Sequence, residues 1–526
     1  MHKHGLTHGK GKMNMHPFYR VGRAFAALAL IMVLLLPLLS VAAQGGTAQP
    51  IFKATDEALP AFVCGADAFA SYYTLQQIQI AGLDVQNGFR LGIVPFYLED
   101  SSGAYDLGED ARAERLQNGT YDCLLTTLEN VALRGQGVIT AVVDESAGAD
   151  QIWVRGQAET LNDLKGKRIA YSEGSVGQFM VLYAMAVAGL RPGRDVTVLE
   201  ADSVSAAVEA FNKGEADAVS GWEPDINKAA ESGGVRLIGS EKLRVVADVI
   251  LTSRKAIAER AEVVTQFHRA WFAALKAQIE DFPTAARQIA EWGYNDWSGV
   301  SVANAERDLR GALESISQAT LANNLTVMNE PSILVGRMDV ARRVWSLANI
   351  RASEERTVNL VEPRFVLALA DAADLTPNGA PINPSFLMGS RPKIETDDQQ
   401  AGQTLAVLPC RRFDFLPDST ILTRESRRIL EVCVLPVMQS TAGTFLKIVG
   451  ASAWPGPAGT FTEQDIRDFG LARAISVRDF LVSKGIDPSR FVIDTALPPA
   501  ERRESEDEDV QALDRYVELT LFESGR

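Results

Sequence analysis

Several polar residues follow predicted β-strands, at positions where α/β folds bind small molecules. Gly174 and Ser175 would offer N–H and hydroxyl donors to a ligand, and Glu223 would act as an acceptor or as a charge. Trp222 would form an apolar or cation-facing wall. This chemistry is recognition without bond making, so no catalytic residue is predicted. The predicted ligand-binding residues are Asp67, Thr126, Thr127, Glu173, Gly174, Ser175, Trp222 and Glu223.

Two of these groups also have structural explanations. Ser175 and Gln178 fit a capping box, in which the two side chains satisfy the free N–H groups at the start of a helix. Glu223 precedes Pro224, which forces the residue before it into an extended conformation and could simply end the strand. Trp222 could equally belong to the hydrophobic core. The residue pattern leaves both explanations open.

The segment from Glu159 to Asp225 predicts the elements that would position these residues. It contains three short apolar strands separated by two helices, the pattern of a parallel βαβαβ unit. The helix after Ser175 is apolar almost all round, and its positive N-terminal end would face a crevice suited to an anion or a polar head group. The predicted strands are 168–171, 196–199 and 216–220, and the predicted helices are 176–188 and 203–212.

The order of the blocks in this segment resembles the periplasmic solute-binding proteins of the nitrate, taurine and alkanesulfonate ABC-transporter type. The matching blocks are Leu161–Ser175, Gly189–Glu200 and Ala207–Asp225. Residues 114–133, ERLQNGTYDCLLTTLENVAL, resemble a further segment of the same family. The resemblance implies an α/β, two-lobed type II periplasmic-binding-protein fold with a hinge. It also implies a small-molecule solute and an ABC permease as partners, with no cofactor.

The rest of the N-terminal region fits two lobes. Apolar segments at Ile139–Val143 and Gln151–Arg155 would carry the chain to the second lobe, and Val249–Ser253 would bring it back. Two crossings permit closure around a ligand. The solute-binding domain is predicted over residues 50–388, with lobe 1 at about 50–150 plus 255–388 and lobe 2 at about 151–254. Helices at 261–280, 283–292 and 302–317 would pack on the first lobe.

A polar linker at 389–404 precedes a different pattern at 405–526, which predicts an α+β domain of βαβαββ order. This region resembles the OmpA-like C-terminal domain, a family that binds peptidoglycan. That family holds the peptide stem with an Asp and an Arg. The Arg matches Arg473, whereas Ala453 stands near the position of the Asp. A lone guanidinium can still hold a carboxylate through a bidentate contact, but Arg473 could equally be a structural surface residue.

The N-terminal residues 1–43 predict an export signal. The apolar run Ala24–Ala43 follows basic residues and ends in small residues suited to cleavage, although an uncleaved anchor would fit the same pattern. Export to the periplasm or cell envelope would place four cysteines in an oxidising compartment. Two local disulfides, Cys64 with Cys123 and Cys410 with Cys433, and four buried thiols are both consistent with the sequence.

Composition excludes several classes of function. The formal charge of -15 argues against nucleic acid as a partner. Cys and His residues lack the spacing of a metal site, and His268 is the only histidine after residue 16, which disfavours a His-based hydrolase. The predicted binding loops carry the acidic residues Asp67, Glu173, Asp202 and Glu223. These residues favour an amino-bearing, zwitterionic or neutral heterocyclic solute over nitrate or sulfate.

The sequence therefore predicts the extracytoplasmic solute-binding component of an ABC importer, with an OmpA-like domain that could tether it to the cell wall. An alternative is an envelope solute sensor or tethering protein that is not coupled to transport. An enzyme that has reused the fold is disfavoured, because no Ser, Cys and His arrangement for nucleophilic catalysis is present.

Overall fold

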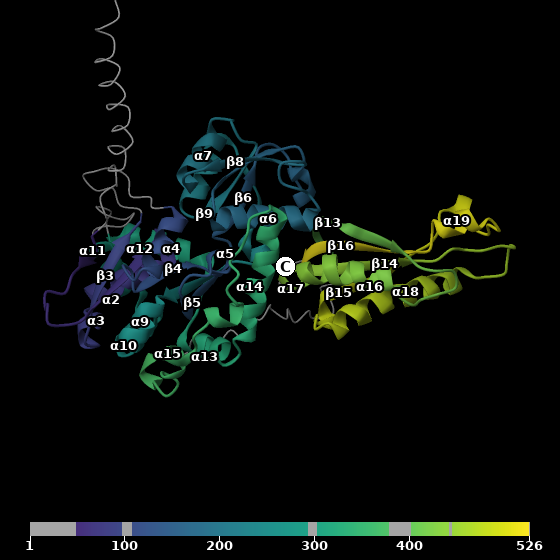
Figure 1. Cartoon of the computed structure of the whole chain (residues 1–526). Helices are drawn as coiled ribbons and strands as arrows, with labels where there is room; N and C mark the ends of the chain where they lie inside the picture. The colour runs from purple at the N-terminus through teal and green to yellow at the C-terminus, as the bar shows by residue number, and fades with distance from the viewer. Residues whose placement is uncertain (1–48, 97–107, 293–301, 378–400, 441–443, 525–526) are drawn as a thin grey trace, which may run out of the picture. The chain divides into compact units, whose positions relative to one another are not determined.

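The structure is a computed structural model that describes residues 49–96, 108–292, 302–377, 401–440 and 444–524 (Figure 1). The predicted export signal at 1–43 and most of the predicted linker lie outside the described residues. Within the described ranges, no helix is long and apolar enough to cross a membrane.

The second lobe contains the predicted βαβαβ unit. Its strand β7 pairs in parallel with both β8 and β9, and the five-stranded sheet has the order β10-β6-β9-β7-β8. Helix α7 packs on this sheet through Val208 and Phe211, which join a buried cluster with Ala170 and Val219. The elements are β6 (Asp150–Val154), β7 (Arg168–Ser172), α6 (Val176–Ala188), β8 (Thr197–Ala201), α7 (Val204–Asn212), β9 (Ala218–Trp222) and β10 (Val235–Gly239).

The first lobe is built on a seven-stranded sheet of order β1-β3-β2-β4-β11-β5-β12. Strand β2 pairs in parallel with β3 and β4. The strands are β1 (Ile51–Phe52), β2 (Ala61–Ala66), β3 (Arg90–Pro95), β4 (Cys123–Thr127), β5 (Val138–Ser146), β11 (Ala247–Thr252) and β12 (Ile316–Gln318). The helices used below are η2 (Ala70–Tyr73), α2 (Thr74–Ile80), α4 (Glu109–Gln117), α5 (Leu128–Arg134), α10 (Ala261–Glu280), α11 (Phe282–Glu291), α12 (Val302–Glu314) and α14 (Ser332–Leu347).

Strand β11 corrects the predicted boundary between the lobes. The predicted second lobe extended to residue 254, yet β11 lies in the sheet of the first lobe, antiparallel to both β4 and β5. Its insertion satisfies backbone hydrogen-bonding groups of both neighbours in the interior, where unpaired groups would be costly. The chain therefore returns to the first lobe between Gly239, the end of β10, and Ala247.

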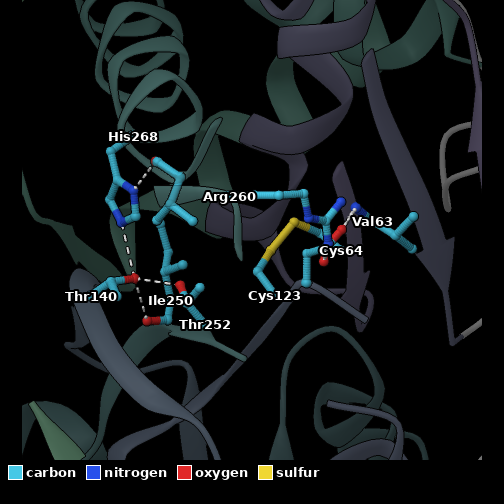
Figure 2. The surroundings of a disulfide bond; sticks show 10 residues. Val63, Cys64, Cys123, Thr140, Ile250, Thr252, Arg260 and His268 are labelled. Carbon is cyan, nitrogen blue, oxygen red and sulfur yellow. Dashed lines mark hydrogen bonds and ion pairs between the residues drawn. A yellow bond between two sulfur atoms is a disulfide. The ribbon is translucent and has the colours of Figure 1, made fainter. Parts of the chain in front are cut away.

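Both pairs of cysteines form disulfides. Cys64 on β2 and Cys123 on β4 stand in register on neighbouring parallel strands and are joined there (Figure 2). Cys410 is joined to Cys433, which lies in the π-helical segment Leu430–Val434. Of the two alternatives that the sequence left open, the structure has the disulfides, which persist in oxidising compartments.

His268 is a structural residue of the first lobe. It is fully buried in α10, with Nδ1 2.7 Å from the carbonyl oxygen of Val264 and Nε2 3.0 Å from the hydroxyl of Thr140 (Figure 2). Burial lowers the pKa of His268 to about 4, so the ring is neutral at pH 7. Its ring nitrogens are engaged within the core and do not face the cavity described below.

The C-terminal region forms the predicted α+β unit around a four-stranded sheet of order β13-β16-β14-β15. Strand β14 is parallel to β15 and antiparallel to β16. Strand β13 begins at Ala401, so the last residues of the predicted linker at 389–404 belong to the sheet. The elements are β13 (Ala401–Asp414), α16 (Arg424–Ile429), α17 (Leu435–Ser440), β14 (Thr444–Ala451), α18 (Glu463–Ser483), β15 (Phe491–Ala496) and β16 (Tyr516–Ser524).

Candidate functional site

One cavity is lined by residues from both lobes. The first lobe contributes strand ends and the segments that follow them, and the second lobe contributes Asp150, Val176 and Trp222. The cavity volume of about 40 Å³ leaves room for about three water molecules. The first-lobe residues at the cavity are Asp67, Phe69, Tyr72, Glu109, Arg112, Leu125, Thr126, Thr127, Asn130 and Asp248.

The predicted ligand-binding residues divide into two groups. Asp67, Thr126, Thr127 and Trp222 line the cavity, whereas the other four do not. The four outside the lining are Glu173, Gly174, Ser175 and Glu223.

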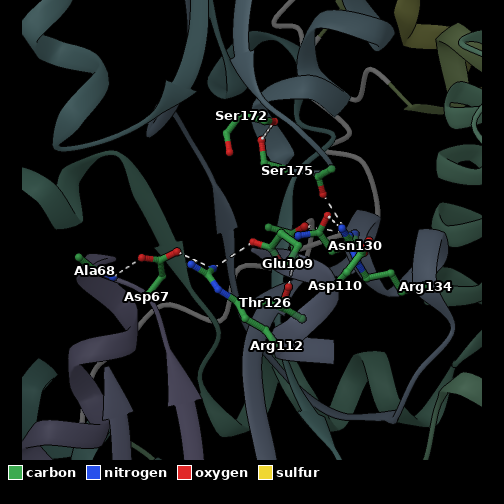
Figure 3. Close-up of polar contacts among 12 residues, drawn as sticks. Asp67, Ala68, Glu109, Asp110, Arg112, Thr126, Asn130, Arg134, Ser172 and Ser175 are labelled. Carbon is green, nitrogen blue, oxygen red and sulfur yellow. Dashed lines mark hydrogen bonds and ion pairs between the residues drawn. The ribbon is translucent and has the colours of Figure 1, made fainter. Parts of the chain in front are cut away.

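Asp67 reaches the cavity as part of an ion-pair cluster with Arg112 of α4 (Figure 3). Arg112 Nη1 donates to Asp67 Oδ2 at 2.8 Å and to Glu109 Oε1 at 3.1 Å. The guanidinium also lies over the ring of Phe96, 4.3 Å from its centroid. Arg112 is the only cationic side chain among the described cavity residues, and two carboxylates already neutralise it.

Thr126 and Thr127 are positioned by the junction between β4 and α5. Thr127 is the N-cap of α5, and its hydroxyl accepts a hydrogen bond from the backbone N–H of Asn130 at 3.3 Å. The side-chain amide of Asn130 donates to the hydroxyl of Thr126 at 3.4 Å. Both threonines are 8% exposed, so their hydroxyls face the cavity with little contact to bulk water.

Ser175 caps helix α6. Its hydroxyl donates to the carbonyl oxygen of Ser172 at 2.6 Å (Figure 3) and lies 3.5 Å from the backbone N–H of Gln178. The side chain of Gln178 in turn accepts from the N–H of Gly174 at 2.7 Å. The start of the helix is therefore capped by Ser175 as predicted, although Gln178 bonds the N–H of Gly174 and not the N–H of Ser175 that a capping box requires. Val176 is the residue of α6 that lines the cavity.

Replacing Ser175 by Ala distinguishes the capping role from a ligand-binding role. We expect the substitution to lower the free energy of unfolding by about 1 kcal/mol, the usual effect of losing an N-cap hydroxyl, and to leave ligand affinity within about twofold. Chemical denaturation and a binding titration of the same variant measure the two effects. A large loss of affinity at unchanged stability would instead assign Ser175 to the ligand.

Gly174 and Glu223 form contacts between the two lobes. Arg134 of α5 donates to the carbonyl oxygen of Gly174 at 3.0 Å. Glu223 accepts from Gln151 at 3.0 Å and from the hydroxyl of Ser315, in the first lobe, at 2.9 Å. Gly174 has a φ of +66°, a backbone conformation that favours glycine. Glu173 beside it is exposed.

Three buried aspartates form the part of the site that sequence analysis missed. Asp144 on β5 and Asp248 on β11 are cross-strand partners, and Asp150 begins β6. They are at most 3% exposed. The hydroxyl of Ser71 donates to Asp144 at 2.5 Å, and the hydroxyl of Tyr72 donates to Asp248. Asp150 and Asp248 line the cavity, so they place two acidic groups at its surface.

Burial raises the pKa values of these carboxyl groups. The pKa of Asp150 rises to about 8, chiefly through burial and further through the charges of Asp248 and Glu223. Burial likewise raises the pKa of Asp144 to about 7 and moves that of Asp248 upward, each reinforced by a neighbouring aspartate. Burial also raises the pKa of Glu129, on α5, to about 8. A carboxyl group that lacks a compensating cation keeps its proton in such surroundings.

A sequence signal for these residues exists. Asp144 directly follows Ile139–Val143, and Asp248 directly precedes Val249–Ser253, two of the apolar segments predicted to cross between the lobes. An acidic residue within an otherwise buried strand requires a partner or a function. What the sequence does not show is that the two strands are adjacent, which places the carboxyl groups together.

Arg473, the predicted peptidoglycan-binding residue, is 1% exposed in α18. Its guanidinium donates to the carbonyl oxygens of Ala451 at 2.8 Å, Ser419 at 3.0 Å and Leu416 at 3.4 Å. Burial lowers the pKa of Arg473 to about 10. These contacts tie α18 to β14 and to the loop that precedes α16.

The cavity residues include no Cys or His. Across the described ranges, no group of His, Cys, Asp and Glu side chains has an arrangement that could hold a metal ion.

Comparisons with known proteins match the two-lobed region. The family model described as NMT1/THI5 like matches residues 134–286. The alkanesulfonate-binding protein SsuA from Xanthomonas axonopodis pv. citri bound to MOPS is 20% identical, with a TM-score of 0.44 over 58% of this chain and 98% of that chain. The periplasmic nitrate-binding protein NrtA from Synechocystis PCC 6803 is 10% identical, with a TM-score of 0.46 over 60% and 90%.

An enzyme gives a comparable match: the desulfurization enzyme DSZB is 13% identical, with a TM-score of 0.41 over 60% of this chain and 99% of that chain. No curated protein matches the chain.

Proposed function

We propose that this protein is an extracytoplasmic solute-binding protein that closes its two lobes on a small polar solute and presents it to an ABC permease. The observation that carries the proposal is a cavity lined by residues of both sheets. A ligand held there contacts both lobes only when they are closed, so its binding energy would shift the population toward the closed form.

The segments that connect the lobes support hinge closure. The chain leaves the first lobe after β5 and returns after β10, and these two connections contact each other. The hydroxyls of Ser146 and Ser240 are 2.7 Å apart, and the N–H of Gly148 donates to the Ser240 hydroxyl at 2.8 Å. Beyond this hinge, the contacts of Arg134 with Gly174 and of Ser315 with Glu223 would form on closure and break on opening.

A thermal-shift screen of the full chain tests the proposal. The compounds span sulfonates, nitrate, bicarbonate, pyrimidines, amino acids and polyamines. A solute that binds only the native state stabilises it by about 2.7 kcal/mol at a hundredfold excess over its Kd, which raises the Tm by several degrees. If no class of compound raises the Tm, solute capture is contradicted.

For the C-terminal domain we propose a tethering role in the cell envelope, through the OmpA-like resemblance of residues 405–526. Co-sedimentation of the full chain with purified peptidoglycan tests this role. Retention on peptidoglycan would support it, and a protein that stays in the supernatant would contradict it.

The alternative of a solute sensor that is not coupled to transport is tested separately. Stimulation of the ATPase of a reconstituted permease by the solute-loaded protein would favour the importer. Solute binding without such stimulation would favour the sensor.

A further inference from the structure

We propose that the cavity between the lobes takes a small organic cation, a solute whose protonated amine or amidinium nitrogen is held by the carboxylates of Asp150 and Asp248. The inference rests on the proposed solute-binding function and names the chemical class of its ligand.

Acidic groups outnumber cationic groups among the described residues of the cavity. Four carboxyl groups line it, those of Asp67, Glu109, Asp150 and Asp248, against the one guanidinium of Arg112. Arg112 lies 2.8 Å from Asp67 and 3.1 Å from Glu109. Neither Asp150 nor Asp248 forms an ion pair with any described Lys, Arg or His side chain. When Asp150 and Asp248 ionise, the described cavity residues therefore supply no counter-charge to either of them.

Asp150 faces the cavity with little internal compensation. Its side chain is almost fully buried and comes from the second lobe. The hydroxyl of Ser146 donates to its carboxyl group, while the nearby charges of Asp248 and Glu223 are repulsive. Ionising a buried carboxyl group without a partner costs free energy. A cation beside Asp150 would lower this cost by pairing with the carboxylate.

Asp248 belongs to a hydrogen-bond network of acidic and hydroxyl side chains whose described members include no cationic residue. It accepts from the hydroxyl of Tyr72 and faces Asp144, which accepts from Ser71. The Oδ1 atom of Asp144 is buried and has no hydrogen-bond partner among the described residues. Neighbouring carboxyl groups cannot both ionise cheaply. A cation at the cavity would allow Asp248 to ionise while Asp144 retains its proton.

A neighbouring acidic residue shows the contrast. Glu145, which follows Asp144 on β5, is 1% exposed and is paired with Arg244 and with Arg337, the latter at 2.9 Å. The same part of the fold thus supplies two arginines to a buried carboxylate that faces away from the cavity and none to the two that face it. A site for a cationic ligand needs carboxylates that the protein's own cations leave unpaired, and Asp150 and Asp248 meet this condition.

The remaining surface of the cavity suits an organic cation. Phe69, Tyr72 and Trp222 line it, and the rings of Phe69 and Tyr72 pack edge to face with centroids 5.3 Å apart. Aromatic faces attract cations and accommodate the carbon atoms that carry them. A sulfonate or nitrate would instead be placed against Asp150 and Asp248 and would be repelled.

Matched ligands separate charge from shape. Acetamidinium, acetamide and acetate share a small planar shape and differ in charge, as do guanidinium, urea and nitrate. We expect the cationic member of each set to raise the Tm of the full chain and the neutral and anionic members to leave it unchanged. Isothermal titration then gives the affinity of the cation that shifts the Tm most.

Three variants test the residues. Asp150→Asn and Asp248→Asn should each weaken the binding of the cation at least tenfold, because an amide keeps the shape but loses the charge. Glu231→Gln, which changes an exposed carboxylate outside the cavity lining, should leave the affinity unchanged. If Asp248→Asn does not fold, Asp150→Asn alone decides the outcome.

The outcomes distinguish this inference from the function on which it rests. Binding of the anionic members in place of the cations would overturn the cationic ligand and leave solute binding intact. A Tm shift caused by a divalent metal ion and reversed by a chelator would also overturn it. If neither these ligand sets nor any class of compound in the wider screen raises the Tm, both the cationic ligand and the solute-binding function are overturned.

Discussion

Between pH 6.5 and pH 8.5 the ligand-free protein should lose thermal stability. Burial raises the pKa of Asp144 to about 7 and those of Glu129 and Asp150 to about 8. In this range the folded protein holds protons that the unfolded chain has released, so the free energy of unfolding falls as pH rises. The stabilisation is complete below the unfolded pKa values near 4 and is lost as pH passes through about 7 to 8.

Other titrating groups do not interfere in this window. The pKa of His268 is lowered to about 4 by burial, so its contribution has the opposite sign but ends near the unfolded value of about 6.5. The pKa of Asp217 is lowered to about 2 by its hydrogen bond from Arg168, and its contribution ends near pH 4. The charged and titratable groups around the three buried acids are Tyr72, Glu145, Glu223, Asp248 and Arg337.

Melting curves of the full chain measure the effect. After allowance for coupling among the acids, we expect a loss of about 2 kcal/mol across the window, which lowers the Tm by at least about 4 °C. Asp150→Asn should reduce this pH dependence because it removes one of the protons. A bound organic cation should reduce it further. A Tm that rises across the window would contradict the assignment of these carboxyl groups as protonated.

Replacing Gly450 by Ala should destabilise the C-terminal domain severely. Gly450 lies on β14, where α18 approaches the sheet at Gly470. A Cβ atom at residue 450 would lie 1.9 Å from the carbonyl oxygen of Gly470. That oxygen belongs to the backbone of a long helix and cannot rotate away, so the helix itself must move off the sheet. We expect a loss of at least about 3 kcal/mol, the range of severe packing defects.

Denaturant unfolding followed by a probe in the C-terminal domain measures this loss. Gly311→Ala is the matched control, since Gly311 lies in α12 with no atom within 4 Å of the added Cβ. An added Cβ in an exposed helix is neutral or stabilising by up to about 1 kcal/mol. If Gly450→Ala unfolds like the unmodified protein, the close packing of α18 on β14 is wrong.

Local signals were sufficient to predict many elements. Helix α6 was predicted at its observed bounds, because Ser175 caps a long apolar segment and a glycine follows it. Helix α10 was likewise predicted at its observed bounds, Ala261–Glu280. The parallel βαβαβ unit and the order of elements in the C-terminal domain were also predicted and are confirmed. In each case the determining residues are neighbours in the sequence.

The errors and omissions concern long-range pairing. Strand β12 was predicted as the end of a helix, because residues 316–318 become a strand only through pairing with β5. Strand β11 was assigned to the wrong lobe for the same reason. Roles for Ser175 and Gly174 at the ligand stay predictions, and the hydrogen bonds that the structure gives them lie within the helix cap and across the lobes. Distance between strands cannot be read from periodicity alone.

Hydrophobic period and capping residues act over a few positions, so the sequence by itself determined the βαβαβ unit, the separate C-terminal α+β unit and the bounds of several helices. The two-lobed arrangement was implied by the family resemblance. Only the tertiary structure decided which side chains meet. The pairing of β5 with β11 places Asp144 beside Asp248, and the start of β6 brings Asp150 to the same cavity. Burial in that shared space, which no local pattern encodes, raises the pKa values of all three aspartates.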